Sequence, residues 1–500
     1  YYGEKWASWW LDLARYSDSK GYETDRGRNI WEYRDWVIKS LNKDLPFDEF
    51  TIQQIAGDLL PNPSYDQLLA TAFHRNTMNN DEGGTNDEEY RVAAVIDRVN
   101  TTFDVWQSTT MGCVQCHDHP YDPIRHKEYY QLMSFFNNTR DEDLMGESPN
   151  LRSYSKKVEN KIDKVLEFIS EKTDKQTLNI YRNFFKYLEP KYALHNSIVL
   201  NSENGFISGE TLNLRNKGIA VYKNINTRGF ENLYFKHGGG RKNTKLIFRK
   251  NSPDGNVIAS INLNQNKYWF DGKNNSYFKI KIKKELKPFD LYIEAINRDL
   301  YTNNSVSYDY KDLAAQIDWI SFLPNIPVSN STELLKLDRD INTILNTPKN
   351  LTPIMVENED FMKRKTYLFD RGNWLNKKEE VNSQVPSILN KWDLEWEKNR
   401  LGFSKWIISK ENPLTARTLV NRVWYQIFGK GLVSSIEDMG TQSDPPSHPA
   451  LIDWLAFNFM NDMNWSLKSL IKKIVMSSTY KQSSNIDENK FKLDPNNLYY

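Results

Sequence analysis

The chain contains 500 residues, more than one hydrophobic core usually supports, so we expect two to four domains. Its 66 Lys and Arg nearly balance its 65 Asp and Glu, for a net charge of +1, and this balance argues against a nucleic-acid partner. No apolar run reaches the roughly 18 residues of a membrane span, so none is expected in this chain. The only two cysteines stand three positions apart, which excludes a disulfide framework.

Residues 1–150 have the periodicity of α-helices. Apolar and aromatic residues recur every three or four positions near the start, at Trp6, Trp9, Trp10, Leu13 and Tyr16. A long helix is expected from about residue 87, with an apolar stripe made of Val92, Val95, Ile96, Val99, Phe103 and Trp106. Residues 151–194 predict a helical connector, since one face of this segment is apolar and the other is heavily charged.

The composition changes between residues 195 and 325, where short apolar runs alternate with turn signals. Leu233-Tyr234-Phe235 precedes three glycines, and Leu246-Ile247-Phe248 precedes Pro253-Asp254-Gly255. This spacing predicts an antiparallel β-sandwich of the jelly-roll type. Residues 326–500 read as a polar, irregular linker followed by a helical domain that is truncated at its end. The expected fold class is therefore multidomain α+β, with two mainly α-helical domains interrupted by the sandwich.

One motif carries chemistry. Cys113-Val114-Gln115-Cys116-His117 is the Cys-x-x-Cys-His signature of covalent c-type haem attachment. Two thiols one helical turn apart can add to the vinyl groups on one porphyrin edge, and the adjacent imidazole reaches the iron. We therefore expect Cys113 and Cys116 to hold the porphyrin and His117 to be the metal ligand.

Other interpretations of this motif stay open. A non-haem zinc or iron site would need further ligands, which His74, His119 and His126 can supply. A redox-active cysteine pair, or two inert cysteines, would also give the same pattern. If haem is bound, the residue on its distal side is taken to be His74, with the alternatives His126, Met78, Met133 or no ligand at all.

Polar residues cluster around the motif. The candidates for acid–base catalysis are Arg75, Glu82, Asp118 and His119, which lie in stretches dense in charged and amide side chains. Solvated loops and helix caps account for most clusters of this kind, so a purely structural role for these residues is the alternative.

The first 140 residues resemble the planctomycete-type cytochrome domain, a family of unknown function. The matching stretches are Trp9-Trp10-Leu11-Asp12-Leu13-Ala14-Arg15-Tyr16, Ala56-Gly57-Asp58-Leu59-Leu60-Pro61, Phe73-His74-Arg75-Asn76-Thr77 and Cys116-His117-Asp118-His119-Pro120-Tyr121-Asp122-Pro123. Residues 354–484 resemble the domain that follows it in such proteins, through Thr366-Tyr367-Leu368-Phe369-Asp370-Arg371-Gly372, Asn412-Pro413-Leu414-Thr415-Ala416-Arg417 and Phe428-Gly429-Lys430-Gly431-Leu432-Val433. One departure is Met439, where the family usually has Phe between Asp and Gly. The resemblance implies export, haem and electron transfer with a redox partner protein or an upstream cytochrome c domain.

The inserted segment resembles a family 6 carbohydrate-binding module. The similarity is carried by Gly238-Gly239-Gly240, Asn251-Ser252-Pro253-Asp254-Gly255 and the closing strand Gln316-Ile317-Asp318-Trp319-Ile320-Ser321-Phe322. It implies a polysaccharide ligand, for which Trp269, Tyr268 and Tyr301 are the candidate stacking residues, whereas Trp319 is expected in the core. The alternative is a sandwich that serves only as a spacer.

These patterns favour an exported c-type haem redox protein, linked to polysaccharide use through the sandwich. One alternative is a haem-dependent oxidoreductase or a metal-dependent hydrolase, in which His74, Cys116, His117, His119 and Asp122 would bind the metal. A second alternative is a non-catalytic glycan-binding surface protein. We expect the chain to be a fragment whose signal peptide lies upstream and whose location is the periplasm or the cell surface, since Tyr1 opens inside an expected helix.

Overall fold

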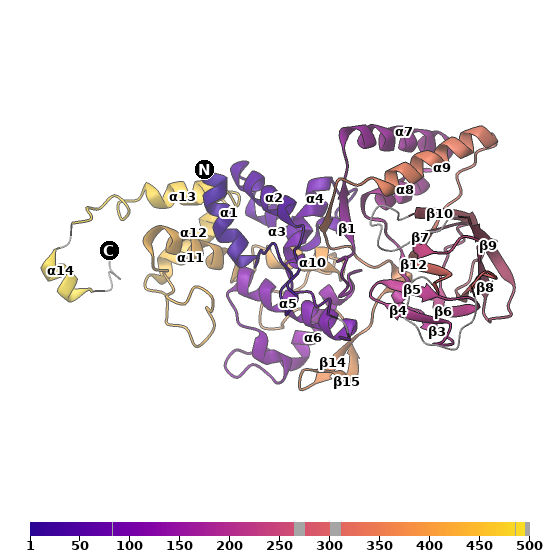
Figure 1. Cartoon of the computed structure of the whole chain (residues 1–500). Coiled ribbons are helices and arrows are strands. Elements are labelled where there is room, and N and C mark those ends of the chain that lie inside the picture. Colours follow the sequence, from indigo (N-terminus) through magenta and orange to yellow (C-terminus); the bar gives the residue numbers. More distant parts are fainter. Residues whose placement is uncertain (83, 265–275, 301–311, 486, 496–500) are drawn as a thin grey trace.

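The computed structural model describes residues 1–82, 84–264, 276–300, 312–485 and 487–495. It confirms the expected fold class, because helical regions near both ends of the chain flank two packed antiparallel sheets (Figure 1). Within these residues, every helix is too short or too polar to cross a membrane.

The N-terminal region is helical, as predicted. Its longest helix, α5, begins where the side chain of Asn86 accepts a hydrogen bond from the backbone N–H of Glu88, and it ends at Ser108, whose φ is +41°. Most of the expected α5 stripe is buried, and Ile96 is half-buried. The helices of this region are α1 (Tyr2–Leu13), α2 (Trp31–Asn42), α3 (Phe47–Ala56), α4 (Tyr65–Ala70), α5 (Asp87–Gln107) and α6 (His126–Asn137).

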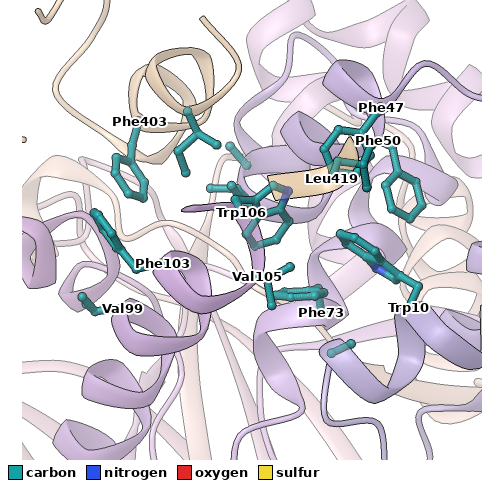
Figure 2. Packing of buried hydrophobic residues seen from close by; sticks show 14 of the residues in the cluster. Trp10, Phe47, Phe50, Phe73, Val99, Phe103, Val105, Trp106, Phe403 and Leu419 are labelled. Atoms are coloured by element: carbon teal, nitrogen blue, oxygen red, sulfur yellow. The ribbon is translucent and has the colours of Figure 1, made fainter. Parts of the chain in front are cut away.

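The C-terminal helices complete the core of the N-terminal ones. Phe403 stacks on Phe135 with ring centroids 4.8 Å apart, and the Gln107 side chain donates a 2.6 Å hydrogen bond to Thr415. Figure 2 shows Phe403 and Leu419 beside the cluster that contains Trp106. The two helical regions therefore share one hydrophobic core. The C-terminal helices are α10 (Arg400–Ile407), α11 (Thr415–Phe428), α12 (Pro449–Met460), α13 (Leu467–Val475) and α14 (Glu488–Leu493).

The sandwich has two sheets, with strand orders β10-β7-β12-β5-β4 and β3-β6-β11-β8-β9, and β2 also pairs with β12. Along β11 buried and half-buried residues alternate, as expected of a strand with one face in the core. The strands are β2 (Tyr192–Ala193), β3 (Ile198–Val199), β4 (Gly205–Ser208), β5 (Thr211–Leu214), β6 (Gly218–Ile225), β7 (Asn232–Gly240), β8 (Thr244–Lys250), β9 (Val257–Leu263), β10 (Ser276–Lys281), β11 (Phe289–Ile296) and β12 (Ala315–Leu323).

Three helices cover the outer face of one sheet. α7 (Lys156–Lys172), α8 (Lys175–Tyr187) and α9 (Ser331–Asn346) lie together beside the sandwich (Figure 1). All nine residues of β12 are buried in consequence, and Trp319 packs against Phe184 with ring centroids 6.2 Å apart. Residues 326–400 are therefore less irregular than their polarity suggests, because the few apolar residues of α9, among them Leu337 and Ile341, suffice to attach it to this surface.

A short ribbon joins the sandwich to the helical body. β1 (Asn150–Ser153) pairs antiparallel with β13 (Asn350–Pro353), with Ser153 opposite Asn350. The chain thus leaves the helical body on one strand and returns on its neighbour. A second hairpin follows, made of β14 (Thr366–Asp370) and β15 (Asn373–Val381).

Candidate functional site

The cysteine motif begins in a short 3₁₀ helix, η3 (Gly112–Gln115), between α5 and α6, and Cys116 and His117 directly follow it. Met111 and Val114 are fully buried and fix this turn to the helical core. Residues three apart lie on the same side of a 3₁₀ helix, so the turn puts Cys113 and Cys116 on one face. Both are free cysteines, Cys113 half-buried and Cys116 exposed.

The two thiols differ in their surroundings. Burial raises the pKa of the Cys113 thiol. Cys116 lies against the turn of the β14–β15 hairpin, where a Cβ atom added to Gly372 would be 3.0 Å from its sulfur. Gly372 also has a φ of +75°, a conformation that side chains other than hydrogen disfavour. A larger residue at this position would strain the turn and displace the Cys116 sulfur.

His117 is exposed, and a neighbouring carbonyl group sets its tautomer. Its Nδ1 atom lies 2.7 Å from the backbone oxygen of Asp118. A carbonyl oxygen only accepts hydrogen bonds, so Nδ1 carries the proton and Nε2 keeps its lone pair. Metal-binding histidines in proteins usually have this arrangement, with one ring nitrogen tied to a hydrogen-bond acceptor and the other directed at the ion.

The two acid–base candidates beside the motif have structural partners. The Nδ1 atom of His119 accepts the backbone N–H of Asp122 at 2.8 Å, and it lies 3.3 Å from the backbone nitrogen of Tyr121. The Asp118 carboxylate accepts the backbone N–H of His126 at 2.7 Å, at the start of α6. These contacts hold the loop in shape, and a catalytic role for either residue stays a prediction.

The structure does not bring His74 to this loop. Its imidazole is fully buried among the rings of Phe73, Phe136 and Trp106, at centroid distances of 4.9, 4.9 and 6.2 Å. Burial, together with the nearby Arg98 charge, keeps the pKa of His74 well below its usual range, so the ring is neutral. No contact of His74 supports its predicted place on the distal side of a haem.

Three other residues could take the distal position in place of His74, and they lie in different surroundings. His126 lies 2.9 Å from the Gln115 carbonyl oxygen through Nε2, which therefore carries a proton. Met133 is buried in α6, whereas Met78 is half exposed beside Gly21.

Arg75 and Glu82 lie elsewhere in the N-terminal region. The Arg75 guanidinium donates 2.8 Å hydrogen bonds to the carbonyl oxygens of Ile354 and Glu147, and burial lowers its pKa to about 10. These bonds tie it to both sides of the β1–β13 ribbon, since Glu147 precedes β1 and Ile354 follows β13. Glu82 accepts a hydrogen bond from the hydroxyl of Thr24. The sugar-stacking candidates Tyr268, Trp269 and Tyr301 lie outside the described residues.

In the ranges that the structure describes, no three His, Cys, Asp or Glu side chains are grouped so that they could hold a metal ion. The ligand set His74, Cys116, His117, His119 and Asp122 is thus not assembled as the hydrolase alternative requires.

Sequence reasoning missed the part that the C-terminal region plays in this site. Asp122 accepts the backbone N–H of Thr441 at 2.8 Å, and Asp438 accepts the hydroxyl of Thr110 at 3.0 Å. Met439 donates its backbone N–H to Ser108 at 2.7 Å. Because this last contact uses only the backbone, the departure from Phe at position 439 leaves it intact.

Two family models match the chain. Residues 1–141 match PSCyt2, described as a protein of unknown function (DUF1549), and residues 399–500 match PSD1, described as a protein of unknown function (DUF1553). Both resemblances expected for the two ends of the chain are confirmed. None of the curated proteins matches the chain.

Solved structures match its middle. CsCBM6-3 from Clostridium stercorarium, in complex with cellobiose, is 14% identical over 27% of this chain and 88% of its own, with a TM-score of 0.19. A family 6 carbohydrate-binding module from Clostridium cellulolyticum, in complex with xylose, gives 14% identity, 27% and 89% coverage and a TM-score of 0.19. A β-1,3-glucan-binding module of this family from Bacillus halodurans is 11% identical over 27% of this chain and 89% of its own, with a TM-score of 0.18. The chain thus carries a PSCyt2 domain and a PSD1 domain, both of unknown function, on either side of a β-sandwich that resembles family 6 carbohydrate-binding modules.

Proposed function

We propose that Cys113, Cys116 and His117 hold a covalently attached c-type haem and that the protein is an exported redox protein. The observation that carries this proposal is the tautomer of His117. Its Nδ1 atom is hydrogen-bonded to the Asp118 carbonyl oxygen, and its exposed ring leaves Nε2 for an iron ion.

The thiols support the same assignment. The backbone N–H of Cys116 donates to the Cys113 carbonyl oxygen at 3.3 Å, so the two cysteines stand at the ends of one turn, a spacing that suits attachment to a single porphyrin edge, and neither is consumed in a disulfide. Met111 and Val114 anchor the turn in the core, so the protein offers a preset frame for both sulfurs. A covalently bound haem would supply a one-electron iron couple.

The position of the loop suits exchange of electrons with another protein. Cys116, His117 and Asp118 are exposed, so a redox partner protein, or a cytochrome c domain upstream in a longer chain, can reach them. Covalent haem attachment implies a location in the periplasm or at the cell surface, in keeping with the family resemblance.

The test is expression of the chain together with cytochrome c maturation proteins. We expect one haem per chain, with an absorption band that stays with the polypeptide after denaturation. Cys113→Ser and Cys116→Ser should each weaken attachment, and His117→Ala should change the spectrum. His448→Ala is the control, because this histidine lies outside the cysteine loop, at the start of α12, and the variant should keep the haem. Protein without haem, or with stoichiometric zinc or iron in its place, would overturn the proposal.

Polysaccharide binding by the sandwich is a second candidate function. It is favoured by a pocket of about 410 Å³ between β7, β9, β10 and α9. Tyrosine rings and amide groups line it together, including Tyr234, Tyr277, Asn262 and Asn342, and such a mixture suits the apolar faces and hydroxyls of a sugar. Binding on a glycan array that is lost in Tyr277→Ala would support this function. An array without binding would exclude it.

A further inference from the structure

A larger pocket lies where the sandwich meets the helical body, and we call it the junction pocket. It measures about 810 Å³ and is lined by the start of α5, by residues 192–196 and 222–224 of the sandwich, and by residues 358–364. Pockets at the junction of separately built regions are common ligand sites. None of the site residues expected from the sequence lines this pocket.

The lining of the junction pocket has more cationic than anionic side chains. Its cationic groups are Arg91, Arg140, His195, Lys223 and Arg364, and its carboxylates are Asp87, Glu88 and Glu142. Several of these cations have partners of their own. Arg91 forms two hydrogen bonds with Glu88, of 2.7 and 2.8 Å, and Lys223 pairs with Asp290 at 2.7 Å.

Arg140 is likewise neutralised, by Glu189 at 2.7 Å. The cations that remain, His195 and Arg364, share one carboxylate. Glu142 lies 2.9 Å from Nε2 of His195 and 3.6 Å from the Arg364 guanidinium. Glu142 is therefore the carboxylate that pairs with both of these side chains.

The pKa values of these groups reflect the shared carboxylate. Burial opposes protonation of His195, but the hydrogen bond and charge of Glu142 prevail and raise its pKa. Burial of Arg364 and the nearby charge of Arg91 lower the pKa of Arg364 to about 10, although the carboxylates of Glu142 and Asp141 act in the opposite direction. Asp87 and Glu210 also act on His195 through their charges, and partial burial raises the pKa of Asp87. An added negative charge would give His195 and Arg364 a second counter-charge beside Glu142.

His195 also has an unused hydrogen-bonding atom. Its side chain is only 7% exposed, and its Nδ1 atom is buried with no hydrogen-bond partner. Buried polar atoms in proteins nearly always have partners, so an orphaned ring nitrogen in a pocket wall indicates a group that the pocket receives. In the protonated ring this nitrogen is a donor, suited to an oxygen anion.

The rest of the lining suits a sugar. Asn86, Asn196 and Asn224 contribute amide groups that can bond to hydroxyl groups, whereas the amide of Asn358 is already bonded to Arg140 and Thr139. Tyr192 and Tyr222 add aromatic rings, whose centroids lie 5.4 Å apart. The pocket therefore combines cationic side chains, amides and aromatic surface.

We propose that the junction pocket binds an acidic carbohydrate, whose carboxylate or sulfate group lies between His195 and Arg364. This site is separate from the cysteine motif and does not depend on haem. It is also separate from the pocket between the sandwich and α9.

The test is isothermal titration of the full chain with three probes: a galacturonate trisaccharide, a sulfated disaccharide and neutral cellotriose. We expect binding of an acidic probe, weakened by added salt, and no binding of cellotriose. The carboxylate and sulfate arms identify which anion the pocket prefers. Equal binding of the neutral probe, or no binding of either acidic one, would refute the proposal.

Variants assign the binding to this pocket. Arg364→Gln and His195→Gln should each weaken binding at least about tenfold, the scale of a lost charge-assisted hydrogen bond. Arg364 also donates to the Thr139 carbonyl, so Asn224→Asp serves as a second variant. Asn224 is exposed, and it has a φ of +56°, which aspartate tolerates, so this change adds repulsion without strain.

Three controls complete the design. Arg417→Gln removes an exposed cation that pairs with Asp453 on the helical body, and it should bind normally. Tyr277→Ala, in the other sandwich pocket, should bind normally too. A Cys113→Ser/Cys116→Ser double variant should also keep its affinity, which separates this proposal from that of haem attachment. Unchanged binding in both Arg364→Gln and Asn224→Asp would show that the probe binds elsewhere.

Discussion

Arg400 of α10 and Asp58, which follows α3, form a buried pair of parallel hydrogen bonds, 2.9 and 2.7 Å long. The same guanidinium reaches Glu357 at 3.0 Å and the Ile55 carbonyl oxygen at 2.8 Å. Arg400 is fully buried. The first and last parts of the chain are thus joined by charge as well as by apolar packing.

Arg400→Met should destabilise the protein by about 3–5 kcal/mol, because it leaves two carboxylates buried without a counter-charge. The free energy of unfolding in urea measures the effect. Arg417→Met, which removes a partly exposed ion pair, should cost at most about 1 kcal/mol. Adding Asp58→Asn and Glu357→Gln to Arg400→Met should recover much of the loss. A loss as small as that of Arg417→Met would mean that the buried network is not needed for stability.

Asp143→Asn should stabilise the protein at pH 8 and have little effect at pH 4. Burial and the neighbouring carboxylates of Asp81 and Asp87 raise the pKa of Asp143 to about 7, despite hydrogen bonds from Asn79 and Asn80. The folded state therefore holds this proton more tightly than the unfolded chain, and stability falls as pH rises from about 4 to 7.

Asparagine keeps an acceptor oxygen at position 143 and carries no charge, so the variant does not lose stability as the pH rises. The free energy of unfolding should rise by about 1–3 kcal/mol at pH 8. This is less than the pKa shift of Asp143 alone would give, because the protein rearranges around the charged carboxylate in both the folded and the unfolded state. Urea midpoints of both proteins, measured from pH 4 to pH 8, test this. Parallel curves over the whole range would contradict it.

Trp106→Ala should cost about 3–5 kcal/mol, since it removes a fully buried ring from the shared core. The indole contacts Trp10 and Phe73 at centroid distances of 5.8 and 4.9 Å and donates a 2.9 Å hydrogen bond to Thr51. Trp454, which is 46% exposed on α12, provides a matched indole, and Trp454→Ala should change stability by less than about 0.5 kcal/mol. Thermal unfolding followed by circular dichroism compares the two.

Cys116 should react with a thiol reagent faster than Cys113 in the chain without haem. Cys116 is exposed, whereas burial raises the pKa of Cys113 and so lowers its thiolate fraction. Rates measured on Cys113→Ser and Cys116→Ser separate the two thiols. Gly372→Ala should alter the rate at Cys116, since its methyl group would meet that sulfur. Equal rates in the two serine variants would show that the turn opens in solution.

The sequence predicted those helices and strands whose apolar residues recur at a regular spacing. The stripe of α5 repeats every three or four residues, and β11 alternates, so both could be recognised without a structure. The pairing of β1 with β13 joins residues far apart in the chain, and no periodicity records such a contact. The core shared by the two helical regions depends on distant contacts in the same way. α9 differs, because its buried residues do repeat every three or four positions, but polar residues make up most of the segment.

The candidate site was predicted in part. Cys113 lies in η3, Cys116 follows its last residue and His117 comes next, and their binding of a haem stays a prediction. His74, which precedes α5, belongs to an aromatic cluster, and its place near a haem stays a prediction. His195 and Glu142 belong to different regions of the chain, so their pairing could not be predicted from the sequence.

The ribbon of β1 and β13 brings together the two ends of the segment between Ser153 and Asn350, so this segment is an insertion in the helical body. Because its entry and exit strands are neighbours, a short turn could replace the whole segment without moving the helices on which the cysteine loop rests. Proteins with the same two end domains could therefore gain, lose or exchange the sandwich as a unit. A ligand preference could change in this way while the chemistry at the other end of the molecule stayed the same.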